Sequence, residues 1–227
     1  MASPASERLA LVKAAIERAV RSVGRDPATI TLVAISKTHD AAAITPLIAA
    51  GQRDFGENRV AEAQGKWPVL LAATPDIRLH LVGQLQSNKA ADAVALFDVI
   101  HSIDRPSLVT ALGRAMTASA GGANKRPDCY IQVNIGNEAQ KGGCAIADLP
   151  AMLAAAAAAG LPVIGLMCVP PADTEAAPFF ALLAELAHRH GLDRLSMGMS
   201  GDYETASMLG ATVIRVGSAL FGAREGL

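Results

Sequence analysis

One lysine lies where the local sequence could support carbonyl chemistry. Lys37 follows the apolar run of residues 31–36, Thr-Leu-Val-Ala-Ile-Ser, which is typical of a buried β-strand. An amine attacks a carbonyl group only in its unprotonated form, and desolvation disfavours the charged form of a lysine. Lys37 is therefore a candidate to form an imine. The alternative is a strand-end lysine that points into water, because strands commonly end in solvated loops.

Two loops rich in glycine and serine could hold a phosphate group. The first is Ser196-Met-Gly-Met-Ser-Gly-Asp202, the second is Arg215-Val-Gly-Ser-Ala219, and each follows a short apolar run. Glycines let backbone N–H groups approach an anion, the hydroxyls of Ser200 and Ser218 can donate to it, and a helix that begins there adds positive potential. Two ordinary turns that cap helices are the alternative, but two such loops together favour phosphate binding.

Eight short apolar runs alternate with helical patterns along the chain. The runs are residues 31–36, 53–56, 79–83, 99–103, 129–133, 163–167, 194–197 and 213–216. Three of the helical patterns, 41–50, 151–159 and 178–190, are each followed by a glycine. A further helix is predicted over residues 4–23, with Ser3 as its N-cap and Pro4 at its first position. The pattern predicts an α/β fold, a single (β/α)8 TIM barrel over residues 1–227 with an extra N-terminal helix.

Composition argues against several classes of protein. The chain has 227 residues, a net charge of -1 and 51% hydrophobic residues, which suits one compact domain and gives no basic bias towards nucleic acid. No uncharged apolar stretch of about 18 residues occurs, and the first eight residues lead into charged amphipathic sequence, so we expect a cytoplasmic protein that does not bind membranes. Cys129, Cys144 and Cys168 are widely spaced, which predicts free thiols and no metal site.

The positions of the chemical groups suggest a ligand. In a (β/α)8 barrel the working face is formed by the carboxyl ends of the strands, and the loops after strands seven and eight frequently bind phosphate. The two glycine and serine loops fall at these two places, and Lys37 follows strand one. A ligand with both an aldehyde and a phosphate would suit them, and pyridoxal 5'-phosphate (PLP) has this shape. A sugar phosphate or a nucleotide is the alternative ligand.

A set of motifs is distributed over nearly the whole chain. They are Ser36-Lys-Thr38, Phe55-Gly-Glu-Asn58, His80-Leu-Val-Gly-Gln-Leu-Gln-Ser-Asn-Lys89, Ile100-His-Ser-Ile-Asp-Arg105, Ile131-Gln-Val-Asn134 with Lys141-Gly-Gly143, Gly165-Leu-Met167, Leu195-Ser-Met-Gly-Met-Ser200, and Arg215-Val-Gly217 followed by Phe221-Gly-Ala-Arg224. Together they resemble the YggS/PROSC family of pyridoxal phosphate homeostasis proteins. The resemblance implies a fold-type-III barrel similar to the N-terminal domain of alanine racemase.

The resemblance also implies roles for particular residues. PLP would be covalently bound to Lys37 as a Schiff base, with phosphate contacts from Ser200, Gly217 and Ser218. Arg215 would face the pyridine nitrogen, and because a guanidinium only donates, the nitrogen would stay unprotonated and the cofactor would be a poor electron sink. A salt bridge at the end of the barrel is the alternative interpretation of Arg215.

Further residues match family positions around the cofactor. Asn58 could donate a hydrogen bond to the PLP hydroxyl, and His80 could pack near the ring or bind water. A purely structural role is an equally good interpretation of either residue. Met199 is expected to fill space beside the ring. His101, inside an apolar run, is interpreted as a core residue rather than a catalytic one.

The chain departs from the family pattern at three positions. Arg59 stands where tyrosine is frequent, Gln84 stands where histidine is often found, and Leu79 replaces a frequent tryptophan. We expect all three at the mouth of the site, where they would change the entrance and leave PLP binding intact.

The tyrosines bear on whether the protein is an enzyme. Alanine racemase uses a lysine and a tyrosine as its two bases, and the tyrosine comes from a C-terminal β-domain across a dimer interface. This chain ends at Leu227 and contains only Tyr130 and Tyr203. The resemblance and the missing second base predict a PLP-binding protein of vitamin B6 and amino-acid homeostasis, with no catalytic residue and no robust turnover. We expect a monomer that supplies apo PLP enzymes; the alternative is a weak monomeric amino-acid racemase.

Overall fold

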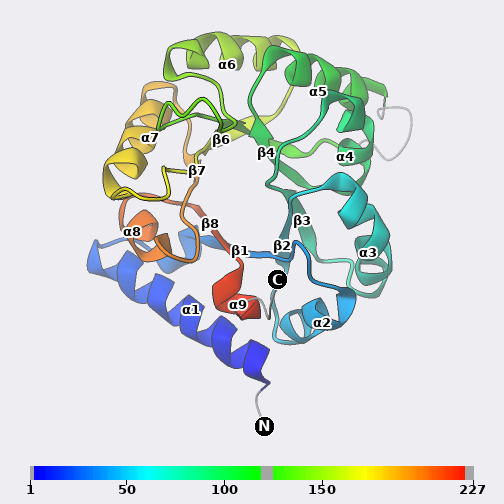
Figure 1. Ribbon diagram of the computed structural model, residues 1–227, viewed down its shortest axis with the longest axis vertical. Coiled ribbons are helices and arrows are strands. Elements are labelled where there is room, and N and C mark those ends of the chain that lie inside the picture. Colours follow the sequence, from blue (N-terminus) through cyan, green and yellow to red (C-terminus); the bar gives the residue numbers. More distant parts are fainter. Residues whose placement is uncertain (1–2, 119–124, 223–227) are drawn as a thin grey trace.

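Eight parallel strands close into one barrel in sequence order (Figure 1). The computed structural model describes residues 3–118 and 125–222, so Arg224 of the last motif lies outside the described ranges. The strands are β1 (Thr31–Ile35), β2 (Asp54–Glu57), β3 (Arg78–Leu81), β4 (Val99–Ile103), β5 (Asp128–Gln132), β6 (Val163–Met167), β7 (Arg194–Ser196) and β8 (Val213–Val216). Because β1 pairs with both β2 and β8, the barrel has no free edge. The predicted (β/α)8 fold is confirmed.

Helices form a ring around the strands (Figure 1). They are α1 (Pro4–Ser22), α2 (Ala41–Ala49), α3 (Val60–Ala73), α4 (Ala90–Leu96), α5 (Pro106–Ala118), α6 (Leu149–Ala158), α7 (Ala177–Arg189), α8 (Tyr203–Met208) and α9 (Ser218–Phe221), with 3-10 turns at Pro27–Thr29, Ser87–Lys89 and Ile146–Asp148. Glycines 51, 160 and 191 follow α2, α6 and α7 with positive φ, as predicted. Within the described ranges, none of the helices is long and apolar enough to cross a bilayer.

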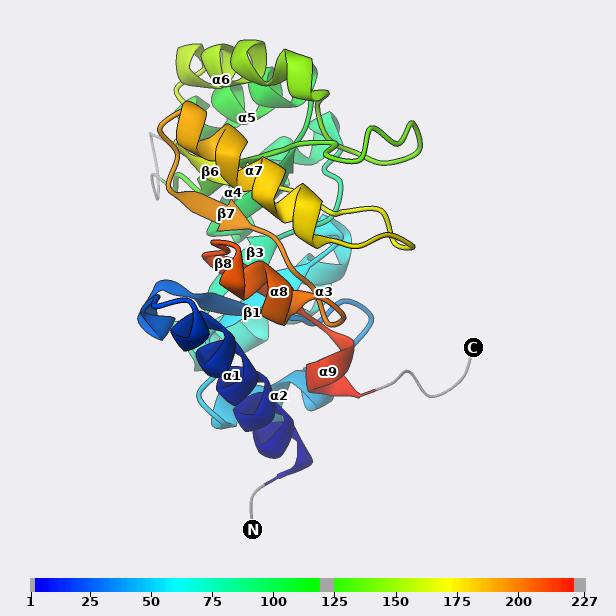
Figure 2. The same cartoon turned by 90° about the vertical axis from the view of Figure 1, so that its left-hand side faces the viewer.

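The extra N-terminal helix α1 packs against α8 and α9, the last two helices of the described residues. It begins at Pro4, and the Ser3 side chain accepts a hydrogen bond from the backbone N–H of Ser6, as the sequence predicts. Figure 2 shows α1 against α8 and α9. Arg8 of α1 donates to the Leu220 carbonyl at 2.6 Å, and Arg25, just after α1, donates to the Ala211 carbonyl after α8 at 2.9 Å. The helix therefore supports the two elements that follow the glycine and serine loops.

Buried side chains form two cores. The larger core lies between the strands and the helices and includes Phe55, Trp67 and Phe180. Successive strand residues point to opposite faces, so the alternate residues of β1 turn inward. Those residues pack with others inside the barrel: Val33, Ile35, Val99, Tyr130, Met167 and Val213. Each fully buried aliphatic side chain contributes about 1.5–3 kcal/mol relative to exposure.

Gly56 on β2 allows the barrel interior to close. A Cβ atom at Gly56 would lie 2.5 Å from Ile35 Cδ1 and 3.0 Å from Val33 Cγ1. Real Cβ atoms do not approach other atoms so closely, so a larger residue at position 56 would force the side chains of Ile35 and Val33 to move. Glycine therefore allows β2 to pack closely against β1, the strand that precedes Lys37.

The three cysteines are free thiols in the core, as the sequence predicts. Burial raises the pKa of Cys129 and of Cys168 to about 12, and it raises the pKa of Cys144 to about 11. All three stay protonated near neutral pH and act as small apolar side chains.

Candidate functional site

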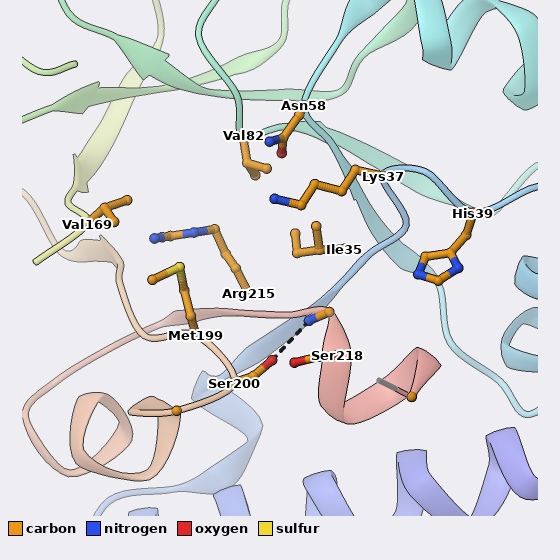
Figure 3. Close-up of a pocket in the computed structure, with 13 residues that line it drawn as sticks. Ile35, Lys37, His39, Asn58, Val82, Val169, Met199, Ser200, Arg215 and Ser218 are labelled. Atoms are coloured by element: carbon orange, nitrogen blue, oxygen red, sulfur yellow. Dashed lines mark hydrogen bonds between the residues drawn. The ribbon is translucent and has the colours of Figure 1, made fainter. Parts of the chain in front are cut away.

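A cavity of about 490 Å³ opens at the carboxyl ends of the strands (Figure 3). This volume is in the range of small-molecule sites. The cavity brings together residues from β1, β8 and the loops that follow β2 and β7. Of the residues predicted around the cofactor, those that line it are Lys37, Asn58, Met199, Ser200, Arg215, Gly217 and Ser218. His80 does not line it.

The amine of Lys37 extends into this cavity (Figure 3). Lys37 follows β1 directly, and its side chain is half-buried. Its amine makes no hydrogen bond or ion pair with any residue in the described ranges. By contrast, Lys89 pairs with Asp92 at 3.2 Å and Lys141 pairs with Glu138 at 2.6 Å. The free amine of Lys37 is thus available to a ligand.

The loop that carries Lys37 is held in a strained conformation. Thr38 has a positive φ of 66°, which is uncommon for a residue with a branched side chain. The Thr38 N–H donates to Glu62 Oε1 at 2.6 Å. Lys66 Nζ donates to the carbonyls of Ser36 at 2.8 Å and His39 at 2.9 Å. Contacts from α3 on both sides of Lys37 therefore fix the loop and offset the strain.

A buried carboxylate anchors these contacts. Glu57 is fully buried and accepts hydrogen bonds from Ser36 Oγ at 2.6 Å and Trp67 Nε1 at 2.9 Å. Lys66 pairs with Glu57 at 2.9 Å and with Glu62 at 2.9 Å. We name Glu57, Glu62 and Lys66 the loop clamp. The sequence reasoning missed the clamp, although the Glu62–Lys66 spacing of four residues on one helix was a signal for part of it.

The two glycine and serine loops meet at one side of the cavity. The Gly217 N–H donates to Ser200 Oγ at 3.4 Å, which joins the loop after β7 to the loop after β8 (Figure 3). The backbone N–H groups of Ser200, Gly201 and Ser218 have no acceptor in the described part of the chain. Unpaired N–H groups beside two hydroxyls form a place where an anion can bind. Because α8 and α9 are short, these local donors matter more than a helix dipole.

Arg215 supplies a buried positive charge at the cavity. It is only 5% exposed, and its guanidinium donates to Ser196 Oγ at 2.7 Å and to the Cys168 carbonyl at 2.9 Å. Burial lowers its pKa, but an arginine stays charged in proteins. It forms no ion pair with a carboxylate of the described residues, in contrast to the salt bridge considered from the sequence. Its charge therefore remains available to a ligand.

Close backbone packing positions Asn58 at the rim. A Cβ atom at Gly83, just after β3, would lie 2.3 Å from the Asn58 carbonyl oxygen. Only glycine allows this approach of the loops after β2 and β3. Strand β3 ends at Leu81, whereas the apolar pattern predicted a strand that continued to Gly83.

His80 lies inside the barrel, below the cavity. It is 2% exposed and contacts the ring of His101 and the carboxylate of Asp54. A direct contact of His80 with the ring of a ligand in the cavity is therefore not favoured. His101 is fully buried, and burial, followed by the nearby positive groups, lowers its pKa well below the ordinary value.

The prediction for the three departures from the family pattern was wrong at one position. Arg59 and Gln84 are exposed but do not line the cavity, so their place at the entrance stays a prediction. Leu79 is instead fully buried in the core between strands and helices. It neighbours His80 on β3, and successive strand residues face opposite sides, so Leu79 must point away from the interior.

Neither tyrosine lines the cavity. Tyr130 lies in the barrel interior, where its ring stacks on His101 at 4.6 Å and burial raises its pKa to about 12. Tyr203 begins α8, and its pKa is also raised by burial. In these positions neither phenol faces Lys37 across the cavity.

Comparison with known proteins adds to the geometry. The family described as alanine racemase, N-terminal domain, matches residues 10–225. An alanine racemase of Clostridium difficile 630 shares the fold, with a TM-score of 0.68 at 11% identity over 94% of this chain and 57% of that one. The class is therefore that of the N-terminal barrels of alanine racemases.

Relatives define the family more narrowly. A pyridoxal phosphate homeostasis protein of Pseudomonas aeruginosa is 43% identical over 98% of this chain and 97% of its own length, and one of Escherichia coli K12 is 38% identical over 97% of each. PipY of Synechococcus elongatus, solved with PLP bound, has a TM-score of 0.80 at 40% identity and covers 96% of this chain and 100% of its own. The chain belongs to the pyridoxal phosphate homeostasis protein family.

Proposed function

We propose that this protein binds PLP in the cavity at the carboxyl face of the barrel and takes part in PLP homeostasis, without robust turnover of its own. One observation carries the proposal: Lys37 and Arg215 enter the same cavity, and neither has an acidic partner among the described residues. A buried cation such as Arg215 normally has such a partner. The name of the relatives and the PLP bound to PipY support this ligand.

The donors of the cavity fit the three polar ends of PLP. The hydroxyls and unpaired N–H groups of Ser200 and Ser218 suit the phosphate, and the N–H of Gly217 lies between them. The guanidinium of Arg215 suits an acceptor such as the ring nitrogen. When bound, PLP supplies an aldehyde that condenses with an amine with loss of water, and Lys37 is the residue we assign to that covalent bond.

Two more residues complete the proposed binding site. Asn58 and Met199 line the same cavity, and we assign them to the ring hydroxyl and to the face of the ring. His80 lies below the cavity, so its role in the site is indirect.

A carrier rather than an enzyme is the form of PLP protein that these residues support. Proton removal from both faces of a substrate needs a second base, and neither Tyr130 nor Tyr203 lines the cavity. An arginine at the ring nitrogen keeps it unprotonated, which weakens the cofactor as an electron sink. We propose a cytoplasmic monomer, one barrel domain, that transfers PLP to apo-enzymes.

Two measurements separate a carrier from an enzyme. With saturating PLP and an L-amino acid in deuterated water, we expect exchange of the Cα proton near background, far below ordinary enzymatic turnover of about 1–10³ per second. The same protein should restore activity to an apo PLP enzyme. Racemisation in the enzymatic range that disappears in Lys37→Ala would instead support the alternative, a weak amino-acid racemase.

A further inference from the structure

A chain of hydrogen bonds crosses the barrel interior below the cavity. It links Arg215 on β8, Ser196 on β7, His101 on β4, His80 on β3 and Asp54 on β2. The distances, in that order, are 2.7 Å to Ser196 Oγ, 2.8 Å from there to His101 Nδ1, 2.9 Å between His101 Nε2 and His80 Nδ1, and 3.0 Å between His80 Nε2 and Asp54 Oδ1. We name it the interior chain. Only Arg215 reaches the cavity.

The two ends of the interior chain favour one direction of its hydrogen bonds. A guanidinium only donates hydrogen bonds, and an ionised carboxylate only accepts them. If each group passes one donor on towards Asp54, both imidazoles are neutral and carry their proton on Nε2. Every donor and acceptor along the path is then used once. The burial that lowers the pKa of His101 favours the same neutral form.

The imidazole of His101 is held at the centre of the interior chain. Its ring stacks on Tyr130, with the ring planes 6° apart, and His101 and Ser196 are both fully buried. A buried polar network stabilises the fold only when each member has a hydrogen-bond partner, because an unpaired polar group in the interior raises the free energy of the folded state. In the direction given above, every member of the network has a partner, and the Ser196 hydroxyl donates to His101 and accepts from Arg215.

The guanidinium of Arg215 is tied at two points. Nη1 donates to Ser196, and Nη2 donates to the Cys168 carbonyl. With both nitrogens anchored, the plane of the group is fixed, and its remaining N–H donors are left for the cavity. The Cys168 anchor is backbone, so the hydroxyl of Ser196 is the side-chain anchor that the interior chain controls.

We propose that Ser196, His101, His80 and Asp54 are positioning residues for Arg215. They hold the guanidinium in the orientation in which it donates to the ring nitrogen of PLP, and so they contribute to the affinity of the site without touching the ligand. This inference rests on the proposed function. It also gives His80 a role that its place below the cavity allows.

The test compares PLP with its 1-deaza analogue, in which C–H replaces the ring nitrogen. The ratio of the two dissociation constants isolates the contact at that atom. We expect Ser196→Ala to weaken PLP by about tenfold, the size of one hydrogen bond to a charged group, and to leave the deaza analogue nearly unchanged. Asp54→Asn keeps an acceptor for His80 and should retain most of the wild-type ratio.

Ser207→Ala is the matched control. Ser207 is also fully buried and donates to a backbone carbonyl at 2.7 Å, but it lies on α8 outside the interior chain. It should leave the ratio unchanged. If Ser196→Ala weakens both ligands equally, the residue is merely structural and the inference is wrong.

A second variant separates this inference from the proposed function. Arg215→Met should abolish the preference for PLP over the deaza analogue. If it does not, Arg215 does not face the ring nitrogen and that part of the proposed function fails. If Arg215→Met abolishes the preference and Ser196→Ala leaves it intact, only the interior chain is refuted.

A measurement on the unmodified protein needs no variant to fold. Nitrogen-15 NMR of the imidazoles should show His80 and His101 neutral near pH 7.5, both protonated at Nε2. A proton on Nδ1 of His101, or a charged His101, would contradict the direction of the interior chain.

Discussion

At the scale of residues, the site depends on donors that have no partner in the protein itself. Lys37 and the N–H groups of Ser200 and Ser218 are unpaired within the described ranges, and they face one cavity. These residues are half-buried or exposed, so water can reach the donors in the free protein, and the ligand that we propose would give them an anionic group and a carbonyl as partners.

The phosphate contacts can be tested by ligand choice. Ser200→Ala together with Ser218→Ala should weaken PLP much more than pyridoxal, which lacks the phosphate, because each lost hydrogen bond to a charged group costs about 1.5–3 kcal/mol. Titration of both ligands by fluorescence measures the difference. Equal losses for the two ligands would show that these serines only cap helices.

His101 gives a prediction about acid stability. Its pKa is lowered in the folded protein, chiefly by burial, so the unfolded chain binds a proton at higher pH than the folded one. Folding stability should therefore fall as pH decreases below about 6.5, the ordinary value for histidine. Urea unfolding between pH 7.5 and 5 measures how steeply the free energy of unfolding changes with pH. This dependence on pH should be weaker in His101→Phe. An unchanged slope would show that His101 titrates normally.

At the scale of elements, residues of β2 and α3 hold the loop after β1 in one conformation. The loop clamp holds the backbone on both sides of Lys37, although its own residues do not line the cavity. Rigid elements position functional side chains better than free loops do, and Thr38 remains at positive φ because of the support.

Breaking the loop clamp should be costly. Lys66→Met leaves the fully buried Glu57 without its cation, and breaking a buried ion pair typically costs about 3–5 kcal/mol of unfolding free energy. Lys89→Met is the control, because the Lys89–Asp92 pair is about half exposed and such pairs contribute about 0–1 kcal/mol. Chemical denaturation compares the two. A cost for Lys66→Met no larger than for the control would contradict the clamp.

The elements also show what the sequence could predict. Apolar runs and terminal glycines predicted the eight strands and the helices α1, α2, α6 and α7, because both signals are local. The loop clamp and the interior chain were not predicted. The side chains of His80, His101 and Ser196 are in contact because each points into the barrel from a different strand. No local sequence pattern specifies this contact. The position of Leu79 was mistaken for a related reason, since the face of a strand residue depends on register.

At the scale of the whole molecule, the residues that line the cavity and the residues that hold them in place lie in different parts of the barrel. The carboxyl ends of the strands present the cavity, and the interior chain runs from there to Asp54, the first residue of β2. Asp54 lines a second cavity, which it shares with Lys13 and Arg53. The α1 helix packs against α8 and α9, which follow the two glycine and serine loops. The residues that line the cavity lie at the carboxyl ends of the strands. The residues that support them lie in the barrel interior and on the surrounding helices.

The central claim is that Lys37 carries PLP, and borohydride reduction tests it most directly. The purified protein is loaded with PLP, reduced, digested and mapped by mass spectrometry. We predict one phosphopyridoxyl group, on the peptide that contains Lys37, and no stable modification in Lys37→Ala, whose circular dichroism should match that of the wild type. A label that persists in Lys37→Ala, or that lies on Lys89 or Lys141 in the wild type, would contradict the claim.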